Sequence, residues 1–196
     1  MAMRVVRAYE RAQKARPLIV SAVTGFTVMS IGDASVQLCT RNAQLPAVAG
    51  VDVQRNMVSS AYNGAVSPLF FQWYRWLDSV WPGVSPRSLV RKVVVNQIAI
   101  SGLNSPLYLT WCATIEAWLL GAADWEATLT TTRNHLVREV PSLMLTSICC
   151  WMPINVINFG VVPPHLRILY ISSCGVAWTA FLSFVAHREP ASPDVG

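Results

Sequence analysis

The chain has 196 residues, of which 53% are hydrophobic and 13% are charged, with a mean hydropathy of +0.40 and a net charge of +5. Soluble domains carry about 25% charged residues, so this composition leaves too little charge to cover a water-exposed surface. The apolar runs are each about 20 residues long, which is enough to cross a bilayer as a helix. We therefore expect one all-α integral membrane domain, a helical bundle with four to five apolar segments and an N-terminal amphipathic surface helix.

Residues 1–17 are predicted to form that surface helix. Four basic residues recur at helical spacing and share one face, namely Arg4, Arg7, Arg11 and Lys14. A basic amphipathic helix of this kind lies on a membrane surface and favours anionic lipid. The segment is also rich in arginine and poor in acids, as in mitochondrial transit peptides, and no long apolar run follows its start as in a secretory signal.

The first apolar segment is predicted over residues 18–38. It contains Asp33 and Gln37, four residues apart on one helix face. A carboxylate within a membrane span costs roughly 2.5–3.5 kcal/mol, so Asp33 faces a wet cavity or another helix, or else lies near the membrane edge. In the polar loop that follows, Asp52 and Arg55 are spaced to pair with each other.

The second segment, over residues 56–77, has small or helix-breaking residues at every fourth position, Ser60, Gly64 and Pro68. Such a stripe predicts close contact with a neighbouring helix. Asn63 is its one amide. The aromatic residues at the end of the segment are typical of an interfacial belt, namely Trp73, Tyr74, Trp76 and Trp81.

The third segment runs from residue 93 to about residue 120, which is longer than one span requires. Gly102 and Pro106 are predicted to break or tilt it. Two amides, Asn96 and Gln97, lie about one turn inside.

Residues 124–139 are polar and are predicted to form an amphipathic surface helix. Pro141 then opens an apolar segment in which Pro153 can introduce a kink. This segment carries Asn155 and Asn158, three residues apart on one helix face. Because an amide facing lipid has no hydrogen-bond partner, both side chains are expected to face protein or a wet cavity.

A last apolar segment is predicted over residues 166–186. The whole organisation is then a surface helix over 1–17, a membrane bundle over 18–186, and a loose Pro- and Ser-rich tail over 187–196. Pro68, Pro106 and Pro153 are the candidate kinks.

The stretch around residue 155 resembles a known family through Trp151, Pro153, Asn158, Phe159 and Pro163. This pattern is similar to the Trp-Pro…Asn-Phe…Val-Pro signature of the Mpv-seventeen / twenty-two-kilodalton peroxisomal membrane protein family. The resemblance continues in order along most of the chain and implies a small multi-span protein of mitochondrial inner or peroxisomal membranes. It also implies an uncleaved N-terminal segment and a role in solute permeability and mitochondrial homeostasis.

Departures at Met152, Asn96, Thr179 and Phe181 mark the chain as a divergent member of that family. The family's Pro directly follows its Trp, whereas Met152 stands in that place here. The family also has an Asp-Gln pair where this chain has Asn96 and Gln97, which puts in doubt any ion-binding role of that position.

Catalytic and cofactor-binding patterns are absent from the sequence. No His or Cys pair has metal-ligand spacing, and there is no P-loop, G-x-S-x-G or G-x-G-x-x-G motif. The five cysteines form no C-x-x-C pair and are read as small buried apolar residues. We therefore expect no enzyme, no metal and no cofactor, and the basic charge is read as lipid contact because no nucleic-acid motif accompanies it.

The functional candidates are the polar residues within the apolar segments, Asp33, Gln37, Asn63, Asn96, Gln97, Asn155 and Asn158. In one reading they line a weakly selective path for small solutes. In the other they bond helix to helix in a non-transporting structural, lipid-binding or assembly subunit of a larger mitochondrial membrane complex. The resemblance favours the channel-like reading, in the mitochondrial inner membrane with the peroxisomal membrane as the alternative. The protein could act as a homo-oligomer or as part of a larger complex. If Asp33 lines a pore, Asp33→Asn is expected to alter the conductance, and an unchanged conductance would indicate a purely structural Asp33.

Overall fold

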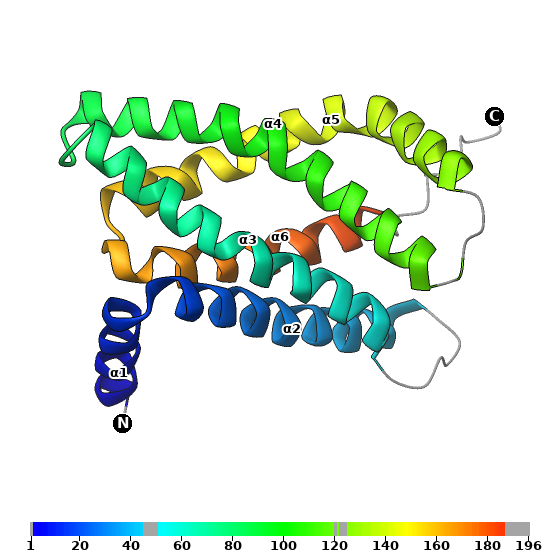
Figure 1. The fold of residues 1–196 in the computed structure, drawn as a ribbon, viewed down its shortest axis with the longest axis horizontal. Helices are drawn as coiled ribbons and strands as arrows, with labels where there is room; N and C mark the ends of the chain where they lie inside the picture. The colour runs from blue at the N-terminus through cyan, green and yellow to red at the C-terminus, as the bar shows by residue number, and fades with distance from the viewer. Residues whose placement is uncertain (1, 45–50, 120, 122–124, 187–196) are drawn as a thin grey trace, which may run out of the picture.

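The computed structural model describes residues 2–44, 51–119, 121 and 125–186, and within these ranges all regular structure is helical (Figure 1). The helices are α1 (Ala2–Ala15), α2 (Pro17–Gln44), α3 (Val53–Val80), α4 (Pro86–Leu119), α5 (Trp125–Gly160) and α6 (Arg167–Ala186), with a short 3-10 turn, η1 (Pro164–Leu166), before α6. The predicted all-α bundle is thereby confirmed. The predicted loose tail over 187–196 lies outside the described residues.

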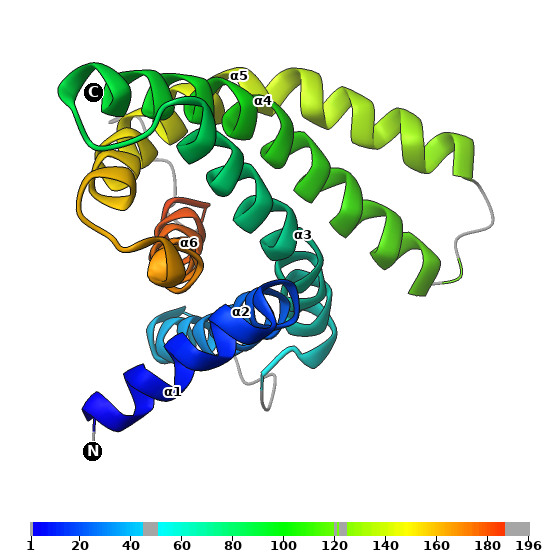
Figure 2. The same ribbon diagram turned by 60° about the vertical axis from the view of Figure 1, so that its left-hand side comes forward.

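Helix α2 packs along both α3 and α6, and α4 packs along α5 (Figures 1 and 2). Helix α1 turns away from the first turn of α2, because Pro17 begins α2 as a separate helix. The first position of a helix suits proline, since its missing N–H needs no partner there. Asp52 begins α3 as its N-cap, accepting the Arg55 backbone N–H at 3.0 Å. Gly83, at φ 78°, supplies the left-handed residue in the turn between α3 and α4.

Polar side chains fill the inside of the bundle and apolar side chains cover its outside. In the described part, 16 polar or charged residues are buried against eight apolar ones, while large apolar residues such as Ile98, Leu145 and Val161 are 70% or more exposed. A soluble protein shows the reverse distribution. The outside therefore suits lipid, and inside the bundle several buried polar groups bond to a neighbouring helix, as Asn56 does to Ser30.

Hydropathy alone finds fewer spans than the predicted four to five. Among the described residues, the segment Pro17–Leu38 is the one helical stretch that is long and apolar enough to cross a membrane, and Leu145–Gly160 is apolar but shorter. Buried Ser, Asn and Gln residues of α3, α4 and α5 lower the mean hydropathy of these three helices.

The predicted boundary at Pro141 is wrong, because the polar residues 125–139 and the apolar segment after them form one helix, α5, which continues through Pro141. Helix α4 is not broken at Gly102 and Pro106, while the alternative of a tilt there stays a prediction. Helices α3 and α5 likewise run unbroken through Pro68 and Pro153. A proline removes a single backbone hydrogen bond, and packing over a helix of 28 residues or more sustains the remaining ones.

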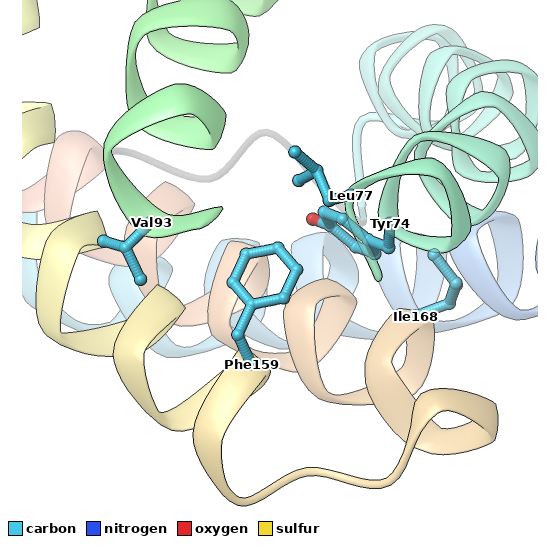
Figure 3. Close-up of a cluster of buried hydrophobic side chains, with 5 residues drawn as sticks. All are labelled: Tyr74, Leu77, Val93, Phe159 and Ile168. Atoms are coloured by element: carbon cyan, nitrogen blue, oxygen red, sulfur yellow. The ribbon is translucent and has the colours of Figure 1, made fainter. Parts of the chain in front are cut away.

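An aromatic and aliphatic core holds α3, α4, α5 and α6 together at one end of the bundle (Figure 3). The rings of Tyr74 and Phe159 form a T-shaped pair with centroids 5.4 Å apart. Tyr74 is thus buried core and not part of an interfacial belt. Trp76 is 48% exposed and fits that predicted belt, stacked on Trp73.

Candidate functional site

The buried carboxylate of Asp33 joins α2 to α3. It is 1% exposed and accepts hydrogen bonds from Gln37 Nε2 at 2.7 Å and from Asn56 Nδ2 at 3.2 Å, and it forms an ion pair with Arg55 at 3.2 Å. Three donors directed at one carboxylate satisfy the charge that would otherwise make this position costly in a membrane. We call Asp33, Gln37, Arg55 and Asn56 the carboxylate clamp.

The predicted pair between Asp52 and Arg55 is not formed. The Arg55 guanidinium reaches Asp33 instead, and Asp52 uses its side chain to cap α3 through the Arg55 backbone N–H. Gln37 Oε1 accepts the Asp52 backbone N–H at 2.7 Å, so the same glutamine contacts both acids. The pair Asp33 and Gln37 and the pair Asp52 and Arg55 therefore form one joint between α2 and α3. The spacing within each pair does not predict this joint.

A cavity of about 100 Å³, lined by amides among aromatic and aliphatic side chains, lies between α3, α4, α5 and α6. A water needs roughly 10–15 Å³ of such volume, so the cavity has room for several waters. We call it the amide cavity after the amides in its wall, and it is lined by Phe70, Tyr74, Asn96, Gln97, Ile100, Asn104, Ser147, Trp151, Asn155, Ile171 and Trp178. No lining side chain carries a formal charge.

Three hydrogen bonds fix the four amides on the walls. Trp73 Nε1 donates to Asn96 Oδ1 at 3.0 Å, and Asn155 Nδ2 donates to Gln97 Oε1 at 3.4 Å across the boundary between α5 and α4. Tyr62 donates to Asn104 Oδ1 at 2.8 Å. Each residue still presents polar atoms to a space whose other walls are aromatic, which suits the binding of small polar molecules.

The seven predicted polar residues thus separate into groups. Asp33 and Gln37 belong to the carboxylate clamp, and Asn63 donates to the Ser59 carbonyl of its own helix. The amide cavity takes the three predicted residues Asn96, Gln97 and Asn155, together with Asn104 and Ser147, which the sequence reading had not singled out.

Asn158 is fully buried, and neither polar atom of its side chain has a hydrogen-bond partner in the described part of the protein. Leaving an amide unpaired in an apolar interior costs about 1–3 kcal/mol. Asn158 lies one turn beyond Asn155 on the face of α5 that lines the amide cavity.

A second charged cluster was missed by sequence reasoning. Asp78 bonds Lys92 Nζ at 2.7 Å and Arg167 at 2.6 Å, joining the end of α3 to the beginnings of α4 and α6. Lys92 is only 2% exposed, and Arg167 lies over the Phe159 ring with its guanidinium carbon 5.1 Å from the centroid. Lys92 and Arg167 each stand at the edge of an apolar run, which suggests a lipid-facing flank. In the sequence, Asp78 is the one acid between Asp52 and Glu116, and this isolated carboxylate was the signal that could have found the cluster.

Helix α1 is held against the bundle by its uncharged and acidic side. Tyr9 Oη lies 3.2 Å from Thr24 Oγ1, Gln13 donates to Ser21 Oγ at 3.0 Å, and Glu10 lies 3.1 Å from His165 of η1. Burial raises the pKa of Tyr9, and the Thr24 hydrogen bond opposes that rise. The predicted lipid-facing residues are all exposed, namely Arg4, Arg7, Arg11 and Lys14.

Within the described ranges, no group of three or more His, Cys, Asp and Glu residues is placed to hold a metal ion.

Comparison with known proteins identifies the family. The model of the Mpv17 / PMP22 family matches residues 125–183, which include all of α5 and most of α6. The mitochondrial inner membrane protein Mpv17 of Bos taurus is 30% identical over 187 residues, covering 95% of this chain and 99% of the relative. The chain belongs to the Mpv17 / PMP22 family.

Two further relatives agree. Mpv17 of Homo sapiens is 30% identical over 190 residues, covering 95% of this chain and 99% of its own length. Protein SYM1 of Saccharomyces cerevisiae is 25% identical over 188 residues, covering 93% and 90% of the two chains. No solved structure matches the chain. Family membership and the names of these relatives place the protein in the mitochondrial inner membrane, which confirms the predicted family and location.

The carboxylate clamp yields a first prediction. Asp33→Asn keeps the side-chain shape but removes the ion pair with Arg55, which is 43% exposed and can be solvated instead. We expect the free energy of unfolding to fall by about 1–2 kcal/mol, measured by thermal unfolding in detergent. Solute flux should stay unchanged because Asp33 does not line the amide cavity, and a changed flux in the folded variant would show that Asp33 faces the path.

Proposed function

We propose that this protein provides a weakly selective path for small solutes across the mitochondrial inner membrane, built around the amide cavity. The observation that carries the proposal is a polar space enclosed by four helices whose outer surfaces are apolar. Polar groups at the centre of a membrane bundle mark a substrate or ion pathway more often than they mark lipid contact. No catalytic step is part of the proposal.

In this proposal all the long helices α2 to α6 cross the membrane. Each has at least 20 residues, and about 20 residues span the hydrocarbon core. The exposed apolar side chains along these helices support the same arrangement, since water would not solvate them. The buried Ser, Asn and Gln residues then face the interior of the bundle and not lipid.

Selectivity should be weak because amides and aromatic rings, without formal charge, form the cavity wall. A space for several waters is not a continuous path, so conduction requires the helices around it to move apart. Asn158 is the amide best placed to gain from such a movement, because both of its polar atoms are unpaired in this arrangement. Together with Asn155, the Asn158 side chain would then form a row of amides along α5.

Flux from reconstituted vesicles tests this proposal. Asn155→Leu replaces a cavity amide with an apolar side chain of similar size, and we expect efflux of a small neutral solute to fall at least several-fold because a polar wall group is lost. Asn134→Leu makes the same change at an exposed position of the same helix and should leave the flux unchanged. Equal flux in both variants and the parent protein would reject the amide cavity as the path.

The carboxylate clamp supports the second candidate function, a non-transporting structural subunit. Its buried charge is fully used in bonding α2 to α3, as expected of groups that fix helix register. Folded protein that gives no flux above that of empty vesicles, and that copurifies with a larger membrane complex, would favour this function over a path.

A further inference from the structure

Basic residues gather at one end of the bundle, which we call the basic end. It comprises α1, the end of α3 with the start of α4, and the segment from η1 into α6 (Figure 1). Side-chain contacts join these parts, since Glu10 lies 3.1 Å from His165 and Asp78 forms ion pairs with Lys92 and Arg167. Residues 2–16, 75–92 and 161–167 hold ten of the chain's 15 Lys and Arg residues but only two of its ten Asp and Glu residues.

Both acids at the basic end are already engaged. Glu10 is paired with His165, and Asp78 is shared by Lys92 and Arg167. Eight basic side chains remain exposed, and none of them has an acidic partner among the described residues, namely Arg4, Arg7, Arg11, Lys14, Arg16, Arg75, Arg87 and Arg91. This excess of positive charge is complementary to an anionic surface outside the chain.

An independent feature places this charge at the level of lipid headgroups. Trp73, Trp76 and Trp81 form a chain of ring contacts beside Arg75, with centroids 5.0 Å and 6.5 Å apart. Exposed tryptophan on a membrane protein concentrates at the membrane–water interface. Helix α1 runs across the N-terminal end of α2, so it lies along the membrane plane if α2 crosses the membrane (Figures 1 and 2).

We infer that the basic end is a binding surface for anionic phospholipid headgroups of one leaflet, formed by α1 together with the start of α4. The hydrogen bonds of Tyr9 and Gln13 fix the rotation of α1, so its cationic side is presented before lipid arrives. Arg87 and Arg91 are exposed at the first turns of α4 and offer a second point of attachment. Two attachment points on one rigid body increase the preference for an anionic leaflet beyond that of one helix. The inference is independent of whether the bundle transports a solute.

Lipid selectivity measured by electron spin resonance tests this surface. The full chain is reconstituted in phosphatidylcholine membranes that contain spin-labelled phosphatidylglycerol or spin-labelled phosphatidylcholine, and the fraction of motionally restricted label is compared. We expect the protein to favour phosphatidylglycerol several-fold, and this preference to decline as salt is raised because headgroup attraction is screened.

Two sets of substitutions and a control locate the preference. Changing Arg4, Arg7, Arg11 and Lys14 together to Gln should lower the selectivity, and Arg87→Gln with Arg91→Gln should lower it independently. Arg133→Gln removes an exposed arginine of α5 outside the basic end and should leave it unchanged. Equal restriction of both labelled lipids by the parent protein, or selectivity that persists after both sets are neutralised, would overturn the inference. Because all these residues are exposed, each variant is expected to fold, and thermal unfolding in detergent checks it.

Discussion

Asp78→Asn is expected to lower the free energy of unfolding by about 3–5 kcal/mol. The carboxylate holds Lys92 and Arg167, which are 2% and 6% exposed, and an asparagine leaves both cations without a counter-charge. Three helices lose their junction at once, because Asp78 is on α3, Lys92 on α4 and Arg167 on α6. Thermal unfolding of the purified protein in detergent measures the change.

A compensating variant tests whether the lost stability comes from the uncompensated positive charges. Lys92→Met in the Asp78→Asn background removes one of the two uncompensated cations while retaining the apolar stem of the lysine. It should recover part of the lost stability. A double variant that is less stable than Asp78→Asn alone would show that Lys92 contributes more through its bond to the Gly83 carbonyl than through charge.

Gly25→Val should separate α2 from α3 and cost about 1–3 kcal/mol or more. A Cβ at Gly25 would overlap Ser67 Oγ and the Asn63 carbonyl oxygen, which lies 2.6 Å from that position. The carbonyl belongs to the backbone of α3 and cannot rotate away as a side chain can. The loss should appear as a lower unfolding temperature in detergent and as weaker protection of the α2 and α3 amides in hydrogen exchange.

Gly102 provides the contrasting control for this close contact. Among the described residues, no atom beyond the adjoining residues and the neighbouring backbone of α4 itself lies within 4 Å of a Cβ built at Gly102. Gly102→Ala should therefore stabilise the protein by up to about 1 kcal/mol through helix propensity, whereas Gly25→Ala should destabilise it. The same sign for both alanine variants would contradict the proposed contact between α2 and α3.

The sequence predicted the helices well where apolar runs are bounded by polar residues, and less well where prolines interrupt them. Pro17 does begin a helix, but Pro141 lies inside α5, because packing along α4 sustains the helix beyond it. The small-residue stripe of α3 correctly indicated close packing, since Gly64 lies against Phe26 and Ala22 of α2.

Partners across helices were much harder to predict than the helices themselves. Arg55 stands three residues from Asp52 in sequence, yet it pairs with Asp33 on another helix. Lys92 and Arg167 each flank an apolar run in the sequence, but in the folded protein both form an ion pair with Asp78. Sequence spacing reports only neighbours on one helix, whereas these bonds depend on how the helices pack.

The most direct test of a solute path through the amide cavity is single-channel recording with a thiol placed in its wall. Ser147→Cys is made in a chain whose five native cysteines are replaced by alanine, and a charged methanethiosulfonate reagent is added during recording. Thr146→Cys, on the exposed face one residue earlier, is the matched control. If solutes pass through the amide cavity, we expect discrete conductance steps that shrink on modification of Ser147→Cys and stay unchanged for Thr146→Cys. Steps that persist at full size after complete modification at position 147, verified by mass spectrometry, would contradict it.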